Sequence, residues 1–317
     1  MKLVDGVLIV DKPAGMTSHD VVARVRNILG ERRVGHTGTL DPFATGVLVM
    51  LTGRATRLAQ YLSGAEKEYE AVIRLGYATD TGDVTGVPVG ESHANAQSTQ
   101  SIREEDIETA LASLRGEMEQ TPPMYSAKKV SGRKLYELAR RGEEVERKPV
   151  CVNVSEFEFI APDGPLLTPE RDGCHDLTVR VVCSAGTYIR TLAEDFGRRL
   201  GLGAHVASLR RTRAGRFTIA EAFTLERLSE LAQSLLIETA LISSDAAIAH
   251  LPAVDLQDDE VSRTLHGIDM QIEDAAVLEW PDCQPVRMRN AGGDLIAVGI
   301  YDKSRKIIHP KVVMANE

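Results

Sequence analysis

The sequence lacks long apolar runs, paired cysteines and the common metal and nucleotide motifs, and each absence excludes a class of protein. No apolar run approaches the roughly 18 residues that a membrane-spanning helix needs, which excludes a transmembrane protein. The four cysteines include no CxxC pair, so neither a disulfide framework nor a cysteine zinc site is expected. The sequence also contains no GxxxxGKS, GxxxxGKT, HExxH or HxH motif, so nothing indicates a P-loop or a metal centre.

The N-terminal segment does not have the pattern of a signal peptide. Its short apolar run is interrupted by Asp5, Asp11 and Lys12, and no small-residue cleavage site follows. We therefore expect the chain to begin with a folded domain and to work in the cytoplasm, where unpaired cysteines stay reduced. At about 150 residues per domain, the 317 residues predict roughly two domains.

The charge of the chain is unevenly distributed. The net charge of −9 disfavours a nucleic-acid partner by itself, because phosphates are neutralised by Lys and Arg. Residues 204–217, however, hold four arginines and no acid, and residues 128–148 hold eight basic residues against four glutamates. Charge alone leaves two interpretations open: ordinary solvated surfaces, which are the commoner case, or a groove that binds an anionic polymer.

The apolar periodicity predicts interspersed strands and helices. Strands are expected at residues 7–10, 67–75, 150–160 and 177–183. Helices are expected at residues 17–29, 101–115, 131–141 and 189–200. Beyond about residue 245 the chain turns to short strands, at residues 286–289, 296–301 and 307–313, which predicts a small β-rich terminal domain.

Two short matches to known sites are rejected. Asp80-Thr81-Gly82 has the form of the aspartic-protease triplet, but a match of three residues is expected by chance. Residues 80–91 have the length of a calcium loop, yet Gly82 and Val84 stand where oxygen ligands belong.

The segment Gly35 to Leu48, GHTGTLDPFATGVL, combines three glycines with a carboxylate beside a proline. Glycine permits close backbone approach and positive φ, and Pro42 stiffens the chain next to Asp41. From spacing alone two interpretations remain open. Either Asp41 caps a backbone group in a tight turn, or a rigid loop presents it as a reactive carboxylate.

GHTGTLDPFATGVL resembles the active-site loop of the TruB family, the tRNA pseudouridine-55 synthases. Further blocks that resemble the family follow in its order over residues 7–217. They are GVLIVDKPAGMTSHDVV, KEYEAVIRLGYATDTGDVTG, PPMYSAKKVSGRKLYELARRG, CSAGTYIRTLAEDFG and GAHVASLRRTRAG. The β-rich terminal part resembles the family's PUA-type domain only in character and position.

The resemblance implies an α+β fold, with a mixed, largely antiparallel sheet flanked by helices. It implies a catalytic domain over residues 1–245, with an RNA-facing insertion at about 120–148, and a PUA-like RNA-binding domain over residues 246–317. The implied reaction converts uridine 55 of the tRNA T loop to pseudouridine. The base is flipped out, its N-glycosidic bond breaks, and it rejoins through carbon 5. No cofactor and no metal are expected.

The motif matches assign roles to individual residues. Asp41 matches the catalytic carboxylate, and burial should raise its pKa, so a cation is needed nearby to keep it charged. Arg190 matches that cationic partner. Tyr69 matches the tyrosine that stacks on the target base, where its hydroxyl can help to remove the carbon-5 proton.

Other matched residues bind the substrate. Tyr188 and Leu209 correspond to pocket positions, and His36 to the residue that fills the space left by the flipped base. Lys12 and Pro13 match the family opening and are interpreted as scaffold. The basic segments are expected to hold the RNA backbone through Lys128, Lys129, Arg133, Lys134, Arg210 and Arg211.

The expected partner is the tRNA T stem-loop, bound by a monomer that needs no obligate protein partner and no membrane. Two alternatives stay open. One is the catalytic subunit of RNA-guided box H/ACA particles, which shares the core motifs. The other is a non-catalytic module that binds or folds tRNA, a role that can also accompany catalysis. Replacement of Asp41 separates the two roles, since only isomerisation requires the carboxylate.

Overall fold

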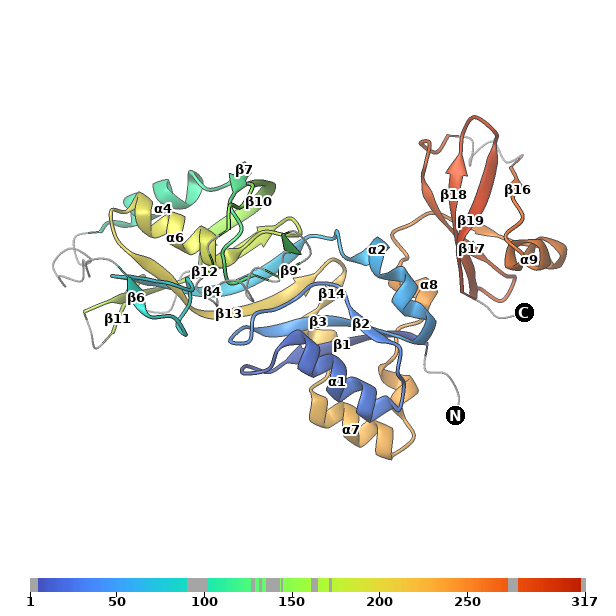
Figure 1. Ribbon diagram of the computed structural model, residues 1–317, viewed down its shortest axis with the longest axis horizontal. Helices are drawn as coiled ribbons and strands as arrows, with labels where there is room; N and C mark the ends of the chain where they lie inside the picture. The colour runs from blue at the N-terminus through green and yellow to red at the C-terminus, as the bar shows by residue number, and fades with distance from the viewer. Residues whose placement is uncertain are drawn as a thin grey trace.

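A ten-stranded sheet forms the centre of the larger part of the molecule in the computed structural model (Figure 1). The structure describes residues 5–89, 102–126, 129–130, 133–134, 143, 145–160, 165–170, 173–272 and 279–314. The main strands lie in the order β1 (Gly6–Lys12), β3 (Thr45–Thr52), β13 (Ala204–Ala214), β4 (Lys67–Leu75), β12 (His175–Cys183), β10 (Val150–Phe159) and β7 (Gly116–Gln120). Short strands β2 (Val34–His36), β14 (Phe217–Thr218) and β11 (Thr168–Pro169) pair at its margins.

The sheet is mixed but largely antiparallel, which confirms the predicted fold class. Only the β3–β13 pair is parallel among the described strands of this sheet. Strand β13 therefore lies between β3, which follows the Asp41 loop, and β4, which carries Tyr69. This single strand connects the two halves of the sheet.

Helices cover the sheet where its strands present apolar side chains. Leu8 and Val10 of β1 pack against α1 (Ser18–Leu29) and α7 (Leu225–Gln233), and the β4–β12–β10 half packs against α4 (Glu104–Ala112) and α6 (Ile189–Arg199). Helix α1 begins at a capping box, in which Thr17 and Asp20 satisfy each other's backbone N–H groups, and it ends at Gly30 with a φ of 62°. These caps stop the helix at both ends, within one residue of the predicted range 17–29.

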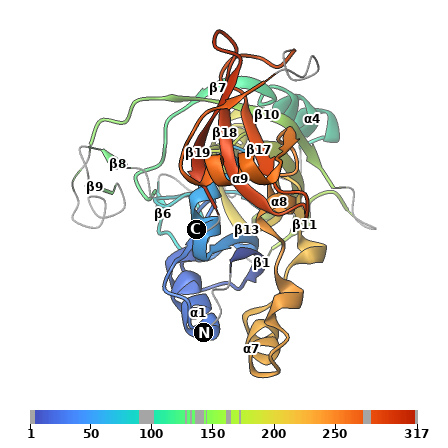
Figure 2. The same ribbon diagram turned by 90° about the vertical axis from the view of Figure 1, so that its right-hand side faces the viewer.

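A separate five-stranded sheet forms the terminal part, with α9 (Asp258–Leu265) beside it (Figure 2). Its order is β15 (Ala253–Asp255), β17 (Pro285–Arg289), β18 (Leu295–Asp302), β19 (Ile307–Val313) and β16 (Met270–Gln271). The strands expected from the sequence are thus present, but α9 was not predicted. Leu295, Val312 and Met314 share an apolar cluster with Leu58 of the larger part, so the two parts are packed together.

The remaining elements are short. They are the 3-10 helices η1 (Gly53–Leu58), η2 (Ile219–Glu221) and η3 (Ile237–Ala240), the helices α2 (Ala59–Leu62) and α8 (Ser244–Ala247), and the hairpin of β5 (Ala78–Thr79) with β6 (Pro88–Val89). A second hairpin, β8 (Lys129–Val130) with β9 (Arg133–Lys134), stands away from the main sheet in Figure 2. No helix within the described residues is long and apolar enough to cross a bilayer.

The hairpin corrects one expectation. A helix was predicted over residues 131–141, but Arg133–Lys134 form a strand that pairs with β8. Ser131-Gly132, a pair that favours turns, stands between the two strands in the sequence and is the signal that the helical spacing obscured. Residues 135–141 lie outside the described residues.

Candidate active site

The loop that carries Asp41 joins β2 to β3, and hydrogen bonds hold the residues on both sides of Asp41. The Ser18 hydroxyl accepts a hydrogen bond from the Leu40 N–H at 2.9 Å. The Pro42 carbonyl accepts from the Gly15 N–H at 2.7 Å and from Lys12 Nζ at 3.2 Å. Lys12 also donates to the carbonyls of Pro13 and Met16, which fits the scaffold role expected for it. A loop held at these points keeps its carboxylate in one place.

The end of this loop is pressed against β13. Gly46 has a φ of +100°, and a Cβ atom at this position would lie 2.2 Å from the Arg211 carbonyl oxygen. Thr45 and Gly46 pair in parallel with Arg210 and Arg211. Only glycine allows this approach, so Gly46 sets the distance between the Asp41 loop and the central strand.

Asp41 forms an ion pair with Arg190, which lies in the first turn of α6. Arg190 Nε lies 2.9 Å from Asp41 Oδ2, and Nη2 donates to Oδ1 at 3.2 Å. The guanidinium also donates to the carbonyls of Thr81 and Tyr125, both at 2.7 Å. Arg190 is only 4% exposed, and these partners satisfy the donors that burial has removed from water.

A second carboxylate completes the arrangement, and sequence reasoning missed it. Asp83 Oδ2 lies 3.6 Å from Arg190 Nη1, and Asp83 is buried. Its other oxygen accepts from the Thr85 N–H and from the hydroxyls of Thr81 and Thr85. Asp83 directly follows the rejected triplet Asp80-Thr81-Gly82 and belongs to the stretch 80–91 that was rejected as a calcium loop. Asp83 lies in the block KEYEAVIRLGYATDTGDVTG that resembles the family, but no role was assigned to it there, and spacing alone could not pair it with Arg190.

The electrostatics of Asp41 follow the expected direction. Burial raises the pKa of the Asp41 carboxyl, the charge of Arg190 opposes this rise, and the nearby charge of Asp83 adds to it. About a third of the Asp41 side chain is exposed, at 33%, so the carboxylate remains open to a ligand on one side. Arg190 is therefore the main group that keeps Asp41 ionised.

A cavity of about 280 Å³ opens above this pair. It brings together five of the residues predicted from the sequence, namely Asp41, Arg190, Tyr69, Tyr188 and Leu209. The rest of its lining comes from residues 38–40, 185–187 and Ile189, with Ser63, Lys67, Ser126 and Arg211. A carboxylate, a cation, two aromatic rings and an apolar side chain around a space of this size suit a flat, polar ring such as a base.

Both tyrosines are fixed in place. The Gln120 side chain accepts from the Tyr188 N–H at 2.7 Å and donates to the Tyr188 carbonyl at 3.1 Å, so it clamps the residue before α6. Tyr69 is 8% exposed on β4. Burial raises the pKa of the Tyr69 hydroxyl, and the charge of Arg211 beside it opposes that rise. Gln120 carries no sequence signal that could have marked it.

His36 does not line the cavity. It is half-buried at the end of β2, and its ring stands edge-on to that of His19 with the centroids 5.7 Å apart. Burial lowers the pKa of the His36 ring, and the charge of His19 adds to this effect. A neutral, flat ring next to the Asp41 loop is compatible with the stacking role expected for it.

The basic residues expected to face RNA divide into three groups, and one of them needs correction. Arg211 is 2% exposed and donates inward to the Val47 and Gly38 carbonyls, because alternation along β13 points it to the same side as Leu209. It is therefore part of the pocket and does not reach the RNA backbone. Arg210 is 38% exposed and pairs with Asp11, and Arg133 is exposed. The third group, Lys128 and the side chains of Lys129 and Lys134, lies outside the described residues.

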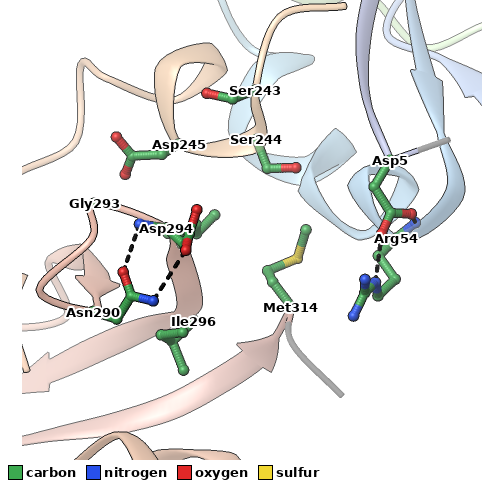
Figure 3. A pocket seen from close by; sticks show the side chains of 11 residues that line it. Asp5, Arg54, Ser243, Ser244, Asp245, Asn290, Gly293, Asp294, Ile296 and Met314 are labelled. Carbon is green, nitrogen blue, oxygen red and sulfur yellow. Dashed lines mark hydrogen bonds and ion pairs between the residues drawn. The ribbon is translucent and has the colours of Figure 1, made fainter. Parts of the chain in front are cut away.

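A larger cavity, of about 480 Å³, lies between the two parts of the molecule (Figure 3). The Asp5–Arg54 ion pair lies on one side of this cavity and the hydrogen-bonded pair Asn290–Asp294 on the other. Ser244 and Met314 lie between them. It contains none of the residues that the sequence marked. Within the described residues, no group of three or more His, Cys, Asp or Glu side chains is placed to hold a metal ion.

Comparison with protein families finds two matches that together cover most of the larger part. Residues 26–189 match the TruB family pseudouridylate synthase N-terminal domain, and residues 190–247 match the tRNA pseudouridylate synthase B C-terminal domain. The first match contains Asp41, Tyr69 and Asp83, and the second begins at Arg190.

Similar curated proteins come from several bacteria. The tRNA pseudouridine synthase B of Pseudomonas paraeruginosa is 39% identical over 93% of this chain and 91% of its own length. That of Geobacillus thermodenitrificans is 45% identical over 83% of this chain and 85% of its own length. That of Symbiobacterium thermophilum is 47% identical over 84% of this chain and 83% of its own length.

Solved structures with a similar fold include a Cbf5-Nop10-Gar1 complex. Its matching chain superimposes with a TM-score of 0.71 at 27% identity, over 98% of this chain and 85% of that chain. An H/ACA ribonucleoprotein bound to a substrate RNA containing 2'-deoxyuridine gives a TM-score of 0.70 at 25% identity, with the same coverage.

Proposed function

The chain belongs to the TruB family of pseudouridylate synthases, and from this premise we propose that it converts uridine 55 of the tRNA T loop to pseudouridine. One observation carries the assignment of the reaction to a site. Asp41 is held by the two-point contact with Arg190 on the floor of a cavity that fits one base. The reaction is an isomerisation, so it needs no co-substrate.

In the proposed mechanism Asp41 acts as an ionised nucleophile, either on the sugar or on the pyrimidine ring. On either route the bond between the sugar and N1 breaks, the base turns, and a bond forms between the sugar and carbon 5. The bond to Asp41 breaks again, the carbon-5 proton leaves to a base or to water, and N1 takes up a proton, so the product has the same atoms as the substrate. Tyr69 is proposed to stack on the ring during these steps and to assist that proton transfer.

The substrate base has to leave the T loop to reach Asp41. Extrusion of a stacked base costs a few kcal/mol. We propose that His36 offsets part of this cost by stacking in the vacated space, while Tyr188 and Leu209 enclose the base in the cavity. Arg210, Arg133 and the lysines of residues 128–134 are proposed to bind the RNA backbone, which reconciles a negative chain with an anionic substrate.

The terminal sheet is proposed to be the PUA-like RNA-binding domain, with the boundary near residue 245, in α8. We also propose that the protein acts as a monomer in the cytoplasm without an obligate protein partner. An additional role in tRNA folding would use the same RNA contacts and would not need Asp41.

The RNA-guided alternative is supported only by the solved structures, at 25–27% identity, against 39–47% for the tRNA pseudouridine synthases. The non-catalytic alternative is disfavoured by the site itself. A buried arginine that holds a partly desolvated carboxylate is costly to maintain in a protein that only binds RNA.

The test is release of tritium from 5-tritiated uridine in an unmodified tRNA transcript. The native protein should release it in the absence of other proteins or guide RNA. Asp41→Asn should not release it, and neither should the native protein with a transcript that has cytidine at position 55. If the folded native protein binds tRNA but releases no tritium, the proposal is wrong. In that case a partner-dependent or purely RNA-binding function replaces it.

A further inference from the structure

Arg211 is a buried cation for which the mechanism above gives no use. Arg211 is only 2% exposed, so its charge is removed from water. An exposed arginine on β13 would not carry this desolvation cost. Within the described residues no carboxylate lies within 4.0 Å of its guanidinium. A buried charge without an opposite charge is costly, so its donors have to be satisfied by other groups.

The position of Arg211 in the sheet places it between the Asp41 loop and Tyr69. On one side Arg211 pairs with Gly46, at the end of the Asp41 loop. On the other side it pairs with Tyr69 across the β4–β13 ladder. Directly paired residues of neighbouring antiparallel strands have Cβ atoms about 5 Å apart and project from the same face. The side chains of Arg211 and Tyr69 are therefore immediate neighbours.

The guanidinium binds the Asp41 loop directly. Its Nε donates to the Val47 carbonyl at 2.7 Å and its Nη2 to the Gly38 carbonyl at 3.0 Å, so it bridges the Asp41 loop from one end to the other. Tyr69 faces the same guanidinium across the ladder, and the charge of Arg211 opposes the rise that burial gives to the pKa of the Tyr69 hydroxyl.

We propose that Arg211 is a positioning residue for the isomerisation, which fixes the Asp41 loop and the Tyr69 hydroxyl relative to each other through one guanidinium. The inference rests on the proposed function, since it assigns a role within that same site. A planar fork with several donors can hold the Val47 and Gly38 carbonyls and still face Tyr69, whereas an ammonium group at the end of a flexible chain cannot. Lysine should therefore not replace Arg211, even though it preserves the charge.

The test compares Arg211→Lys with the native protein in single-turnover tritium release at saturating enzyme, together with the tRNA dissociation constant. Misplacement of a reacting group by about 1 Å costs about 10²-fold in rate, so we expect a loss of that order. The dissociation constant should change less than about threefold, because Arg211 does not face the RNA backbone. The matched control is Arg180→Lys on β12, a partly exposed arginine that pairs with Glu68, Glu156 and Glu158 away from the cavity. It should behave like the native protein.

A double-mutant cycle with Tyr69→Phe separates positioning from a merely structural role. If Arg211 acts through the Tyr69 hydroxyl, the double variant should lose less than the product of the two single losses. Arg211→Gln, which keeps donors but no charge, serves as the second variant. Multiplicative losses would overturn the proposal, as would a native rate in Arg211→Lys or a loss that appears only in tRNA affinity. So would a failure of both Arg211 variants to reach the native circular dichroism spectrum. Failure of the proposed function is distinguishable, because the native protein would then release no tritium.

Discussion

The guanidinium of Arg190 meets the carboxylate of Asp41 side-on, with Nε 2.9 Å from Oδ2 and Nη2 3.2 Å from Oδ1. A two-point contact of this kind fixes the orientation of the carboxylate as well as its charge. The remaining donors of Arg190 are taken by backbone carbonyls and by the charge of Asp83, so the arginine cannot turn to follow another group.

Arg190→Lys should reduce tritium release by about 10²-fold or more, because an ammonium group cannot reproduce the two-point contact. The pH dependence should change as well. Arg190 is the main group that opposes the raised pKa of Asp41, so a weaker contact should move the acidic limb of the rate profile to higher pH. Single-turnover rates of both proteins between pH 5 and 9 measure this shift. An unshifted acidic limb would show that Arg190 does not control the ionisation of Asp41.

Asp41→Asn should make the folded protein more stable at neutral pH while it abolishes the reaction. The pKa of Asp41 is raised on folding, so the folded state holds its proton at a pH where the unfolded chain has lost it. Stability therefore falls as pH rises through this window, and the loss persists at neutral pH. Asparagine carries no such cost. Urea unfolding at pH 7.5 should show the gain, which should shrink as the pH approaches the ordinary range of an aspartate.

Asp20 provides a control of opposite sign for that experiment. Hydrogen bonds from the Thr17 side chain and backbone lower the pKa of Asp20 in the capping box of α1. Its charge therefore favours folding above the ordinary aspartate range, so Asp20→Asn should lower stability at pH 7.5. If both substitutions changed stability in the same direction, the environment of Asp41 would not be the cause.

Burial of Lys67 predicts that the stability of the protein depends on pH in the alkaline range. Burial lowers the pKa of Lys67 to about 8, from 10.5 in an unfolded chain, although Lys67 Nζ donates to the Ser63 and Ala65 carbonyls. Between these values the unfolded chain holds the extra proton, so the contribution of Lys67 to stability rises with pH, by about 2 kcal/mol from pH 8 to pH 10. Lys67→Met removes this slope. Urea unfolding at several pH values measures it, and Lys311→Met, at an exposed lysine, should keep the native slope. An equal slope in Lys67→Met and in the native protein would contradict the buried charge.

The sequence was informative where periodicity and motif agree, and less so where a contact depends on the fold. The alternation of residues 67–75 is present as the strand β4, and the matched loop places Asp41 beside Arg190, which is 149 positions away in the chain. Arg211 was grouped with its neighbour Arg210 by charge. Their separation to opposite faces depends on β13 being a strand, which was not among the predicted strands, and the bulges at residues 206–208 and 211–213 interrupt the alternation on both sides of this pair.

Asp83 shows a different limit. Its function depends on a loop between β5 and β6 that folds back onto α6, and no local pattern encodes such a long-range contact. The stretch around it was judged by the protease and calcium motifs that it fails to match. Thr81, Thr85 and Arg190 converge on this carboxylate only in the folded chain.

Gly46→Ala tests the distance between the catalytic loop and β13. The new Cβ would lie 2.2 Å from the Arg211 carbonyl oxygen and 2.8 Å from its nitrogen, and neither backbone atom can move without displacing the strand. We expect a loss of stability above about 4 kcal/mol, a value seen only with severe steric or cavity defects. The control is Gly201→Ala, where φ is also positive, at +70°, but no atom lies within 4 Å of the new Cβ.

Conformational strain alone should cost Gly201→Ala about 1–2 kcal/mol, so the difference between the two variants isolates the clash. Gly46→Ala should also lose activity at temperatures where it is still folded, because β3 and β13 can only relieve the clash by moving apart. That movement would shift Asp41, on the β3 side, away from Tyr69, on the β4 side. Thermal unfolding and single-turnover tritium release on both variants test this. Equal stability losses, or full activity in folded Gly46→Ala, would show that the close contact at β13 does not set the geometry of the site.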